Sequence, residues 1–317
     1  FNFICYFILF CGMATLTWKQ VFDSDYKRDC VGYAGNTPTR ATCWPNEARI
    51  ALQFVINYEE GGENCILHND QGSEHLLSEI VGAQSYKGER HMNMESLYEY
   101  GSRAGFWRIL NLFKEKELPA TVYAVGMALE KNPAAGKAMV DAGFEVASHG
   151  YRWIDYQNVP IDEEREHIKK AITANIRFTG SRPMGLYQGK PNENTRSLVV
   201  EEGGFLYDSD SYSDDLPYWT YWENDAGQQK SHLVIPYTLD CNDMRFSQGL
   251  ECDRFFSYLK DCFDTLYEEG KEFPKMMTVG LHCRVIGRPA RISALRKFMD
   301  YVKEKEDVWI CRRIEIA

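Results

Sequence analysis

Short apolar stretches alternate with longer amphipathic ones along most of the chain, and this alternation constrains the fold more than any other feature. The apolar stretches are predicted strands, at residues 49–56, 120–125, 143–147, 184–187, 205–207, 233–238, 276–281 and 307–311. The amphipathic stretches are predicted helices, at residues 95–116, 133–142, 161–178, 193–203, 252–269 and 289–304. Buried strands that alternate with helices are typical of a parallel sheet. Without an intervening linker, they predict an α/β fold with one barrel of about seven to eight parallel strands.

Two of the predicted helix boundaries carry capping signals. Asn132 precedes Pro133, which predicts an N-cap followed by proline at the first helical position. Gly180 follows the helix over residues 161–178 and is predicted to end it.

The first residues of the chain differ from the rest. Residues 1–10 are almost wholly apolar, but they are too few to span a bilayer as a helix. No basic residue precedes them and no A-x-A-like cleavage site follows them. We therefore expect an N-terminal extension or leader over residues 1–18, one catalytic domain over residues 19–317, and a cytoplasmic location. Secretion or a cell-wall location is the alternative if the apolar stretch is a true signal.

Charge and cysteine content exclude several classes of protein. The 317 residues carry a formal net charge of −10 with no basic stripe, which argues against a nucleic-acid or membrane partner. Ten cysteines are scattered without a C-x-x-C pair or a zinc-type spacing, so we expect reduced thiols and no disulfide scaffold. The expected partner is a small-molecule substrate.

Titratable and hydrogen-bonding side chains follow six of the predicted strands. In a parallel α/β barrel the carboxyl ends of the strands meet on one face, where active sites form. The first strand ends at two adjacent carboxylates, Glu59 and Glu60. The other strand ends supply His149, Arg152, Trp153, Tyr187, Asp210, Asp243, His282 and Arg284. Taken singly, a charged turn or a core histidine is the simpler interpretation of each motif, but six converging strand ends predict an active site.

The motifs around these residues resemble the polysaccharide deacetylase superfamily, whose shared module is the NodB homology domain. Within it, the chain looks more like the metal-independent allantoinases of purine degradation. The similarity is carried by FVINYEEGGE (54–63), HMNMESLYEYGSRAG (91–105), SHGYRW (148–153), EEGGFLYDSDSY (201–212) and LHCRVIGRPAR (281–291). It spans about residues 26–313. It implies a deformed (β/α) barrel, a homotetramer, and a hydrolase that acts on carbon–nitrogen bonds other than peptide bonds.

The departures from the deacetylase pattern bear on metal binding. Metal-dependent deacetylases have two aspartates where Glu59 and Glu60 stand, and a second metal-binding histidine where Trp153 stands. Indole offers no lone pair, so one carboxylate and His149 are short of the three protein ligands usual for a catalytic metal. We therefore expect no required cofactor, and at most weak metal binding at Glu60 and His149. A divalent metal such as zinc belongs to the deacetylase alternative.

These residues suggest that allantoin is opened to allantoate by acid–base catalysis. Glu59 is the predicted general base, with a pKa raised by Glu60 and by burial, and His282 is the predicted general acid. The predicted substrate contacts comprise carbonyl binding by His149 and Arg284, ring walls from Trp153 and Tyr187, and acceptors for ureido nitrogens on Glu60, Asp210 and Asp243. Arg152 completes the predicted substrate-binding set.

Two other functions remain open on the sequence. The first is metal-dependent N-deacetylation of chitin or another N-acetylglucosamine polymer, since a fold does not fix a substrate. The missing second histidine counts against it. The second is a non-catalytic carbohydrate- or ureide-binding protein, which would have no need for both Glu59 and His282.

Overall fold

The computed structural model describes residues 44–223, 229–248 and 251–317. These residues fall within one compact unit, Pro38–Ala317. The predicted N-terminal extension over residues 1–18, and the domain boundary after it, lie outside the described residues.

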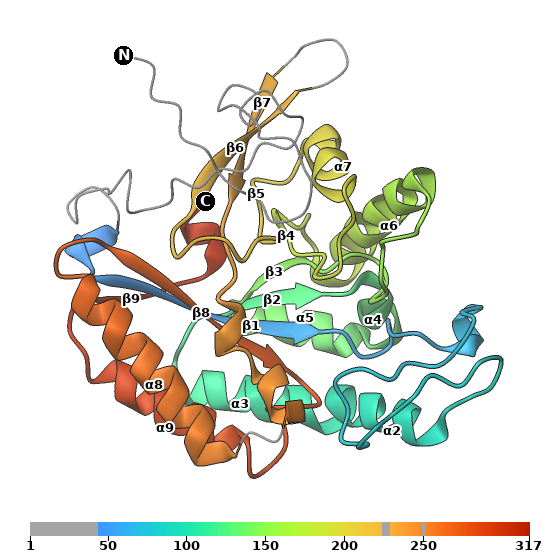
Figure 1. Cartoon of the computed structure of the whole chain (residues 1–317), viewed down its shortest axis with the longest axis horizontal. Coiled ribbons are helices and arrows are strands. Elements are labelled where there is room, and N and C mark those ends of the chain that lie inside the picture. Colours follow the sequence, from blue (N-terminus) through green and yellow to red (C-terminus); the bar gives the residue numbers. More distant parts are fainter. Residues whose placement is uncertain (1–43, 224–228, 249–250) are drawn as a thin grey trace, which may run out of the picture. The chain divides into compact units, whose positions relative to one another are not determined.

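A curled sheet of nine strands forms the centre of the described part of the chain (Figure 1). The strands are β1 Ile50–Tyr58, β2 Thr121–Ala124, β3 Glu145–Ser148, β4 Gly185–Leu186, β5 Tyr207–Asp208, β6 Tyr218–Glu223, β7 Gln229–Val234, β8 Lys275–His282 and β9 Val308–Ile310. Their order is β6-β7-β5-β4-β3-β2-β1-β8, and β9 pairs with β1. All described pairings are parallel except that of β6 with β7. The predicted α/β fold with a deformed barrel is confirmed.

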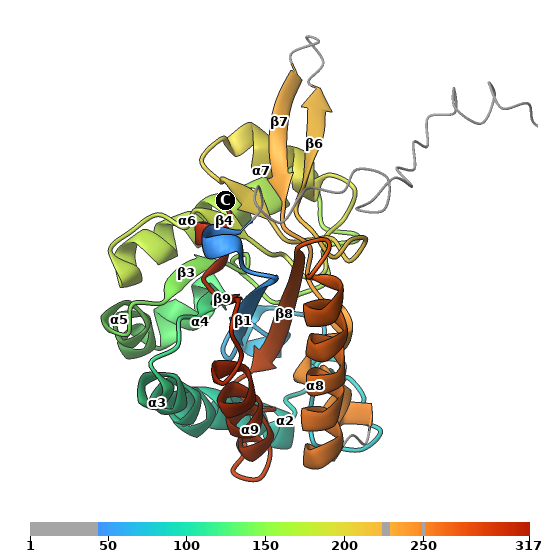
Figure 2. The ribbon, with the colours of Figure 1, turned by 90° about the vertical axis from the view of Figure 1, so that its left-hand side faces the viewer.

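Helices cover the outer face of this sheet (Figure 2). They are α2 Met92–Tyr100, α3 Phe106–Lys116, α4 Gly126–Lys131, α5 Pro133–Asp141, α6 Ile161–Thr179, α7 Thr195–Glu202, α8 Cys252–Glu269 and α9 Ile292–Lys303. Phe54 of β1 meets the edges of Phe113 on α3 and Phe298 on α9, with ring centroids 5.5 and 6.2 Å away. Such edge-to-face contacts add to the burial that holds the helices on the sheet.

The structure corrects three details of the predicted elements. The helix predicted over residues 95–116 is interrupted by a π-helical turn, Gly101–Gly105, and the short α4 was not predicted. Gly180 ends α6 in the left-handed region, as predicted. Asn132 lies at the N-cap of α5, but its side chain makes no capping bond and instead donates to the Tyr58 hydroxyl, 2.9 Å away.

The antiparallel hairpin β6–β7 was also absent from the prediction, which began its strand only at residue 233. The sequence of β6 is YWTYWE, which shows no alternation of apolar and charged residues. It forms an outer strand whose Trp219 and Tyr221 side chains are exposed. A strand with no buried face carries little periodic signal in the sequence.

Residues 235–242 follow β7 in the chain and pass beside β8, where they close the barrel without forming a regular strand. Asn242 forms an isolated bridge with Gly280, and the Thr278 amide donates to the Thr238 hydroxyl at 3.0 Å. A Cβ atom on Gly280 would overlap the hydroxyl of Tyr237, so only glycine permits this approach. Asp243 follows Asn242 in the chain, so this approach brings it to the carboxyl end of β8.

Side chains along the strands alternate between the helices and the barrel interior. In β1, Phe54 and Ile56 belong to the large cluster packed against the helices, whereas Val55 belongs to a small interior cluster. If this alternation continues beyond the end of β1, Glu59 faces the interior and Glu60 faces the helices. The two adjacent carboxylates are thus expected to have different surroundings.

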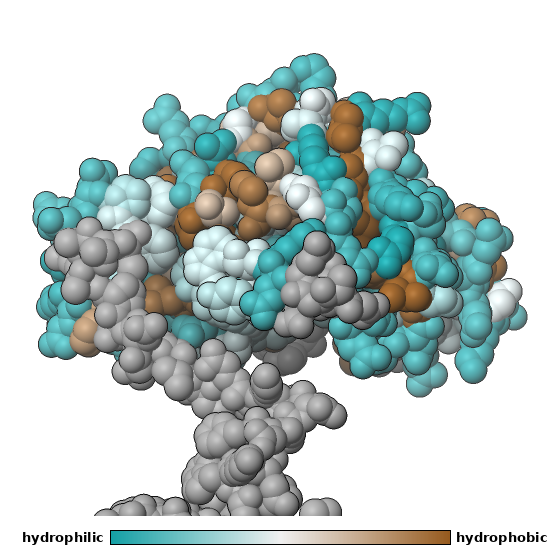
Figure 3. All heavy atoms as spheres, turned by 90° about the horizontal axis from the view of Figure 1, so that it is seen from above, coloured by the Kyte–Doolittle hydropathy of each residue, from teal (hydrophilic) through white to brown (hydrophobic). Residues whose placement is uncertain are grey.

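On the face shown in Figure 3, most of the coloured residues are hydrophilic, and apolar residues gather in several groups among them. Within the described residues, no helix combines the length and the apolar composition needed to cross a membrane.

Candidate active site

Three strands of the barrel each contribute one side chain to a buried cluster. Glu59 follows β1, His149 follows β3, and His282 ends β8. The Nε2 atoms of both histidines lie 3.3 Å from Oε1 of Glu59. The three residues are only 1%, 1% and 5% exposed, respectively. The structure therefore brings together the predicted base, the predicted acid and one predicted substrate ligand.

Arg284 adds a cation to this cluster. Its Nη1 donates to Oε2 of Glu59 at 2.7 Å and lies 3.4 Å from Oε1 of Glu60. The guanidinium lies over the rings of Tyr98 and Trp153, 4.2 and 5.0 Å from their centroids. Its buried Nη2 has no hydrogen-bond partner among the described residues. Since buried donors are usually paired, Nη2 is suited to a substrate oxygen.

Asp243 orients His282. Its Oδ1 accepts from Nδ1 of His282 at 2.6 Å, and Oδ2 accepts the backbone amides of His282 and Ile286 at 2.8 and 3.0 Å. This arrangement leaves Nε2 of the imidazole for Glu59. Asp243 was predicted to bind a substrate nitrogen, but both of its oxygens are taken by protein donors, so it acts in the structure as a positioning residue.

Glu59 and His282 form an ion pair at neutral pH. Burial by itself raises the pKa of Glu59, but His282, Arg284 and the hydrogen bond to His149 hold that pKa well below its usual value. Burial by itself lowers the pKa of His282, but Glu59 and Asp243 raise it to about 10. The prediction of a raised pKa for Glu59 is therefore wrong. That prediction took account of the neighbouring carboxylate of Glu60, but not of the cations His282 and Arg284, which lie far from Glu59 along the chain.

Substituting Asp243 with asparagine is expected to lower the pKa of His282, because one of two stabilising negative charges is lost. The folded-state pKa of about 10 exceeds the reference value of 6.5. The stabilisation from protonated His282 is therefore complete below pH 6.5 and is lost as pH rises through 10. In Asp243→Asn this loss should occur at lower pH. NMR titration of His282 and urea unfolding from pH 6 to 10 measure both effects. An unchanged His282 titration in this variant would contradict the assignment, and the nearby Asp240→Asn is the control.

Glu60 faces the helices, as the alternation along β1 implies. Its carboxylate accepts the backbone amides of Glu59 and Arg284 at 3.2 and 3.1 Å. Burial raises its pKa to about 6, while Arg284 opposes this shift and Glu59 adds to it. It also lines a cleft of about 280 Å³ beside α2. The raised pKa predicted for Glu59 thus belongs to its neighbour.

The π-helical turn Gly101–Gly105 fits closely against the site. A Cβ atom on Gly101 would overlap the carboxylate of Glu60, and one on Gly105 would overlap the carbonyl of Cys283. π-Helical turns inside α-helices often mark functional sites. Here, the turn lets a helix approach the residues that follow both β1 and β8.

Substituting Gly101 with alanine is expected to lower the free energy of unfolding by about 1–3 kcal/mol, because the new methyl group displaces the Glu60 carboxylate. Helix propensity alone would give the opposite sign, since alanine favours helix by about 1 kcal/mol over glycine. Urea denaturation measures the difference. Ser102→Ala, in the same turn, is the control and should change stability by less than about 0.5 kcal/mol. A more stable Gly101→Ala variant would contradict the close fit.

The turn after β4 supports His149. The ring of Tyr187 stacks on His149 at 5.2 Å, and its carbonyl accepts from Nδ1 of His149 at 2.5 Å. Tyr187 also stacks on Tyr237, with ring centroids 4.8 Å apart. Tyr187 was predicted to wall the substrate, but in the structure it is buried and stacked on these two rings, so it supports His149 instead.

Asp210 holds the same turn. Its two oxygens accept the amides of Gln188 and Gly189, each at 2.7 Å. Burial raises its pKa to about 7, and the charge of Asp208 adds to this shift. The predicted contact between Asp210 and a substrate nitrogen is replaced in the structure by these backbone contacts.

Arg152 and Trp153 have different environments. Arg152 donates to the carbonyls of Gly62 and Glu63 at 3.2 and 3.3 Å and to Asp70 at 2.5 Å. Its observed contacts therefore hold the loop after β1, in place of the predicted substrate contact. Trp153 packs beside the site, where the guanidinium of Arg284 lies over its ring.

Lys190 was missed by the sequence reasoning. Its Nζ lies 3.6 Å from the centroid of the Trp153 ring, and burial lowers its pKa against the opposing charges of Glu74 and Glu59. Its position could have indicated a place near the site, because Lys190 directly follows Tyr187, Gln188 and Gly189 at a strand end that was already assigned to the site.

The residues of this site do not fit a divalent metal. Trp153 supplies no ligand, and the Arg284 guanidinium lies against both carboxylates. Glu60 accepts amides while His149 faces Glu59, so the predicted weak pair of ligands is directed to different partners. Among the described residues, neither of them belongs to a group of three side chains spaced to hold a metal ion.

Comparison with known proteins places the chain in a family. The profile of the polysaccharide deacetylase family matches residues 93–201. A putative polysaccharide deacetylase from Schizosaccharomyces pombe (strain 972 / ATCC 24843) is 46% identical over 307 residues, covering 92% of this chain and 95% of the relative. The chain belongs to the polysaccharide deacetylase family.

Solved structures extend this comparison. This polysaccharide deacetylase family member is similar to the crystal structure of a PuuE allantoinase, with 59% identity and a TM-score of 0.88 over 92% of this chain and 96% of that chain. A probable polysaccharide deacetylase from Pseudomonas aeruginosa PAO1 is 57% identical, with a TM-score of 0.87 over the same shares of the two chains. The family relationship indicates a hydrolase that acts on carbon–nitrogen bonds.

Proposed function

We propose that the protein opens the hydantoin ring of allantoin to allantoate without a metal cofactor. The observation that carries this proposal is the buried Glu59–His282 ion pair beside Arg284. It combines the carboxylate of Glu59 as a base, protonated His282 as an acid and the Arg284 guanidinium in one buried cluster. Similarity to an allantoinase of known structure supports the choice of substrate.

Glu59 activates the attacking water in this proposal. The water oxygen bonds to the ring carbonyl carbon while the Glu59 carboxylate takes one of its protons. The carbonyl oxygen becomes negative and is stabilised by Nη2 of Arg284, while His149 stays hydrogen-bonded to Glu59. When Arg284 shares its charge with the substrate, Glu59 loses part of the attraction that lowers its pKa. Substrate binding therefore makes Glu59 a stronger base.

His282 completes the reaction by protonating the leaving nitrogen. The carbon–nitrogen bond breaks, and Nε2 of His282 gives its proton to that nitrogen. Glu59 is then protonated and His282 is neutral, 3.3 Å apart. Proton transfer from Glu59 to His282 across this contact restores the starting ion pair.

Cationic and aromatic groups suit a flat ureide ring. Lys190 and Arg284 offer donors for the carbonyl oxygens of the ring, and both cations lie over the indole of Trp153. An acetylated sugar would present a bulkier, non-planar surface to the same groups. The arrangement therefore favours the ureide over the sugar polymer.

Purified protein incubated with allantoin and with chitin oligomers, each with and without a chelator, tests the proposal. We expect allantoate release that the chelator does not lower. Acetate release that the chelator abolishes would instead establish the deacetylase alternative. Absence of both products would leave a binding protein.

We also propose a homo-oligomer, a tetramer by resemblance, and a cytoplasmic location. Light scattering of the purified chain should give the mass of four copies, and the mass of one copy would contradict this. Cell fractionation distinguishes the cytoplasmic location from the secreted alternative.

A further inference from the structure

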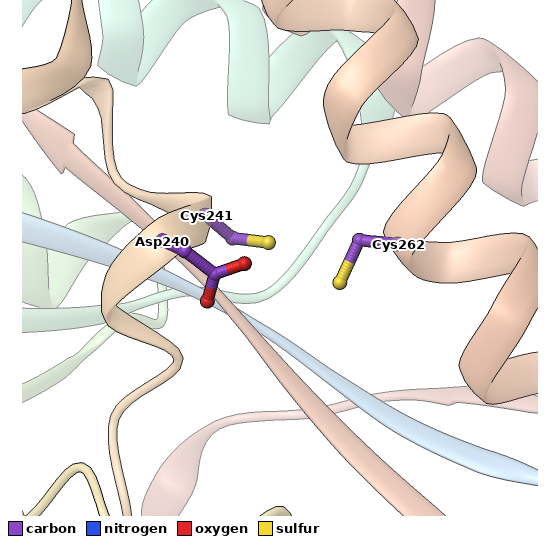
Figure 4. A group of neighbouring side chains, drawn as sticks. All are labelled: Asp240, Cys241 and Cys262. Carbon is purple, nitrogen blue, oxygen red and sulfur yellow. The ribbon is translucent and has the colours of Figure 1, made fainter.

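Two thiols and a carboxylate come together outside the candidate active site (Figure 4). Asp240 and Cys241 belong to the 3-10 turn Leu239–Cys241, and Cys262 projects from α8. Their ligand atoms all lie within 4.8 Å of one another. Cys241 is buried, Cys262 is partly buried and Asp240 is exposed, so the group is open to solvent on one side.

We propose that Asp240, Cys241 and Cys262 bind a thiophilic divalent cation of the zinc class. Thiolates select zinc-like metals over magnesium or calcium. Tetrahedral zinc with bonds of about 2.0–2.3 Å needs its ligand atoms roughly 3.3–3.8 Å apart, which a small inward movement of these side chains provides. Three protein ligands leave a fourth position for water.

The surroundings of Asp240 resemble the support that metal ligands receive. The hydroxyl of Tyr258 donates to Oδ2 of Asp240 at 2.8 Å, and Arg245 donates to the Asp240 carbonyl at 3.2 Å. Tyr258 lies one turn before Cys262 on α8, so one helix supplies both a ligand and the donor that orients another. Hydrogen bonds of this kind fix ligand orientation and commonly contribute 10–100-fold to metal affinity.

The cluster is linked to the active site through the chain. Asp243, only two residues after Cys241, holds the imidazole and the amide of His282.

The test is titration of the chelator-treated full chain with Co²⁺, read by absorbance. We expect a thiolate-to-cobalt charge-transfer band that saturates at one Co²⁺ per chain and disappears on addition of Zn²⁺. Absence of this band would overturn the proposal. Because the readout is spectroscopic, it stands whether or not the protein hydrolyses allantoin.

Variants assign the band to this cluster among the cysteines of the chain. Cys262→Ser should abolish it, whereas Cys252→Ser, on the same helix and outside the cluster, should retain it. Tyr258→Phe should weaken Co²⁺ binding by about 10-fold while keeping all three ligands, and it remains informative if Cys262→Ser does not fold. A band that is unchanged in both Cys262→Ser and Tyr258→Phe would place the metal elsewhere and overturn the proposal.

Discussion

Replacing Glu59 with glutamine is expected to lower kcat for allantoin hydrolysis by about 10³–10⁴-fold, because the water then has no base. Glutamine keeps the size of the side chain, so the chain should still fold. Circular dichroism and steady-state kinetics measure the two properties. The pKa of His282 should also fall, since the nearby negative charge that helps to raise it is lost.

Glu63→Gln is the matched control for this substitution. Glu63 is a buried carboxylate in the same loop, and it accepts the amide of Gly61 at 2.6 Å. Among the described contacts, its carboxylate has no hydrogen bond to His149 or His282. We expect its kcat to change by less than about 10-fold, far below the usual effect of removing a general base. Normal kinetics in Glu59→Gln, or an equal loss in both variants, would refute the role given to Glu59.

Replacing Arg284 with methionine should have the largest effect on stability, a loss of about 3–5 kcal/mol in the free energy of unfolding. The substitution leaves Glu59 and Glu60 buried beside each other without their shared cation. It should also lower kcat by about 10²–10³-fold through the loss of oxyanion stabilisation.

The stability of Arg284→Met should depend on pH in a defined direction. Without the cation, the folded-state pKa of Glu59 and that of Glu60 both rise. A carboxyl group whose pKa is raised by folding makes the folded protein less stable as pH increases. The stability deficit relative to the unmodified chain should therefore be larger at pH 8 than at pH 5 in urea unfolding. Arg296→Met, which breaks an exposed pair with Glu115, is the control and should cost less than about 1 kcal/mol at either pH. A similar small, pH-independent loss in Arg284→Met would show that the buried charges are not coupled.

That Glu59, His149 and His282 lie together could be predicted because parallel strands deliver their last residues to one face. The roles within adjacent pairs could not be assigned in this way. Glu59 and Glu60 differ in role because side chains alternate along β1, and the same alternation places His149 and His282 in the interior. This alternation is only partly visible in the sequence of β1, IALQFVINY, because its interior positions mix apolar residues with Gln53 and Asn57.

The charge states were harder to predict than the positions. Asp243 and His282 are 39 residues apart along the chain, and Arg284 reaches Glu59 from 225 residues away. A pKa depends on these distant partners, which sequence reasoning could not pair. Likewise, Asp210, Tyr187 and Arg152 were recognised as polar or aromatic groups near the site, but their use in holding loops depends on backbone positions.

Closure of the barrel by residues 235–242 has a consequence for inactivation. β1 and β8 are joined by a long continuous ladder, whereas the segment that carries Asp243 is joined to β8 by an isolated bridge and a few side-chain bonds. Such a segment opens at a lower free energy than the sheet. On gentle heating, the acid should therefore lose its alignment while the β-structure persists, so activity and fold have separate thermal limits.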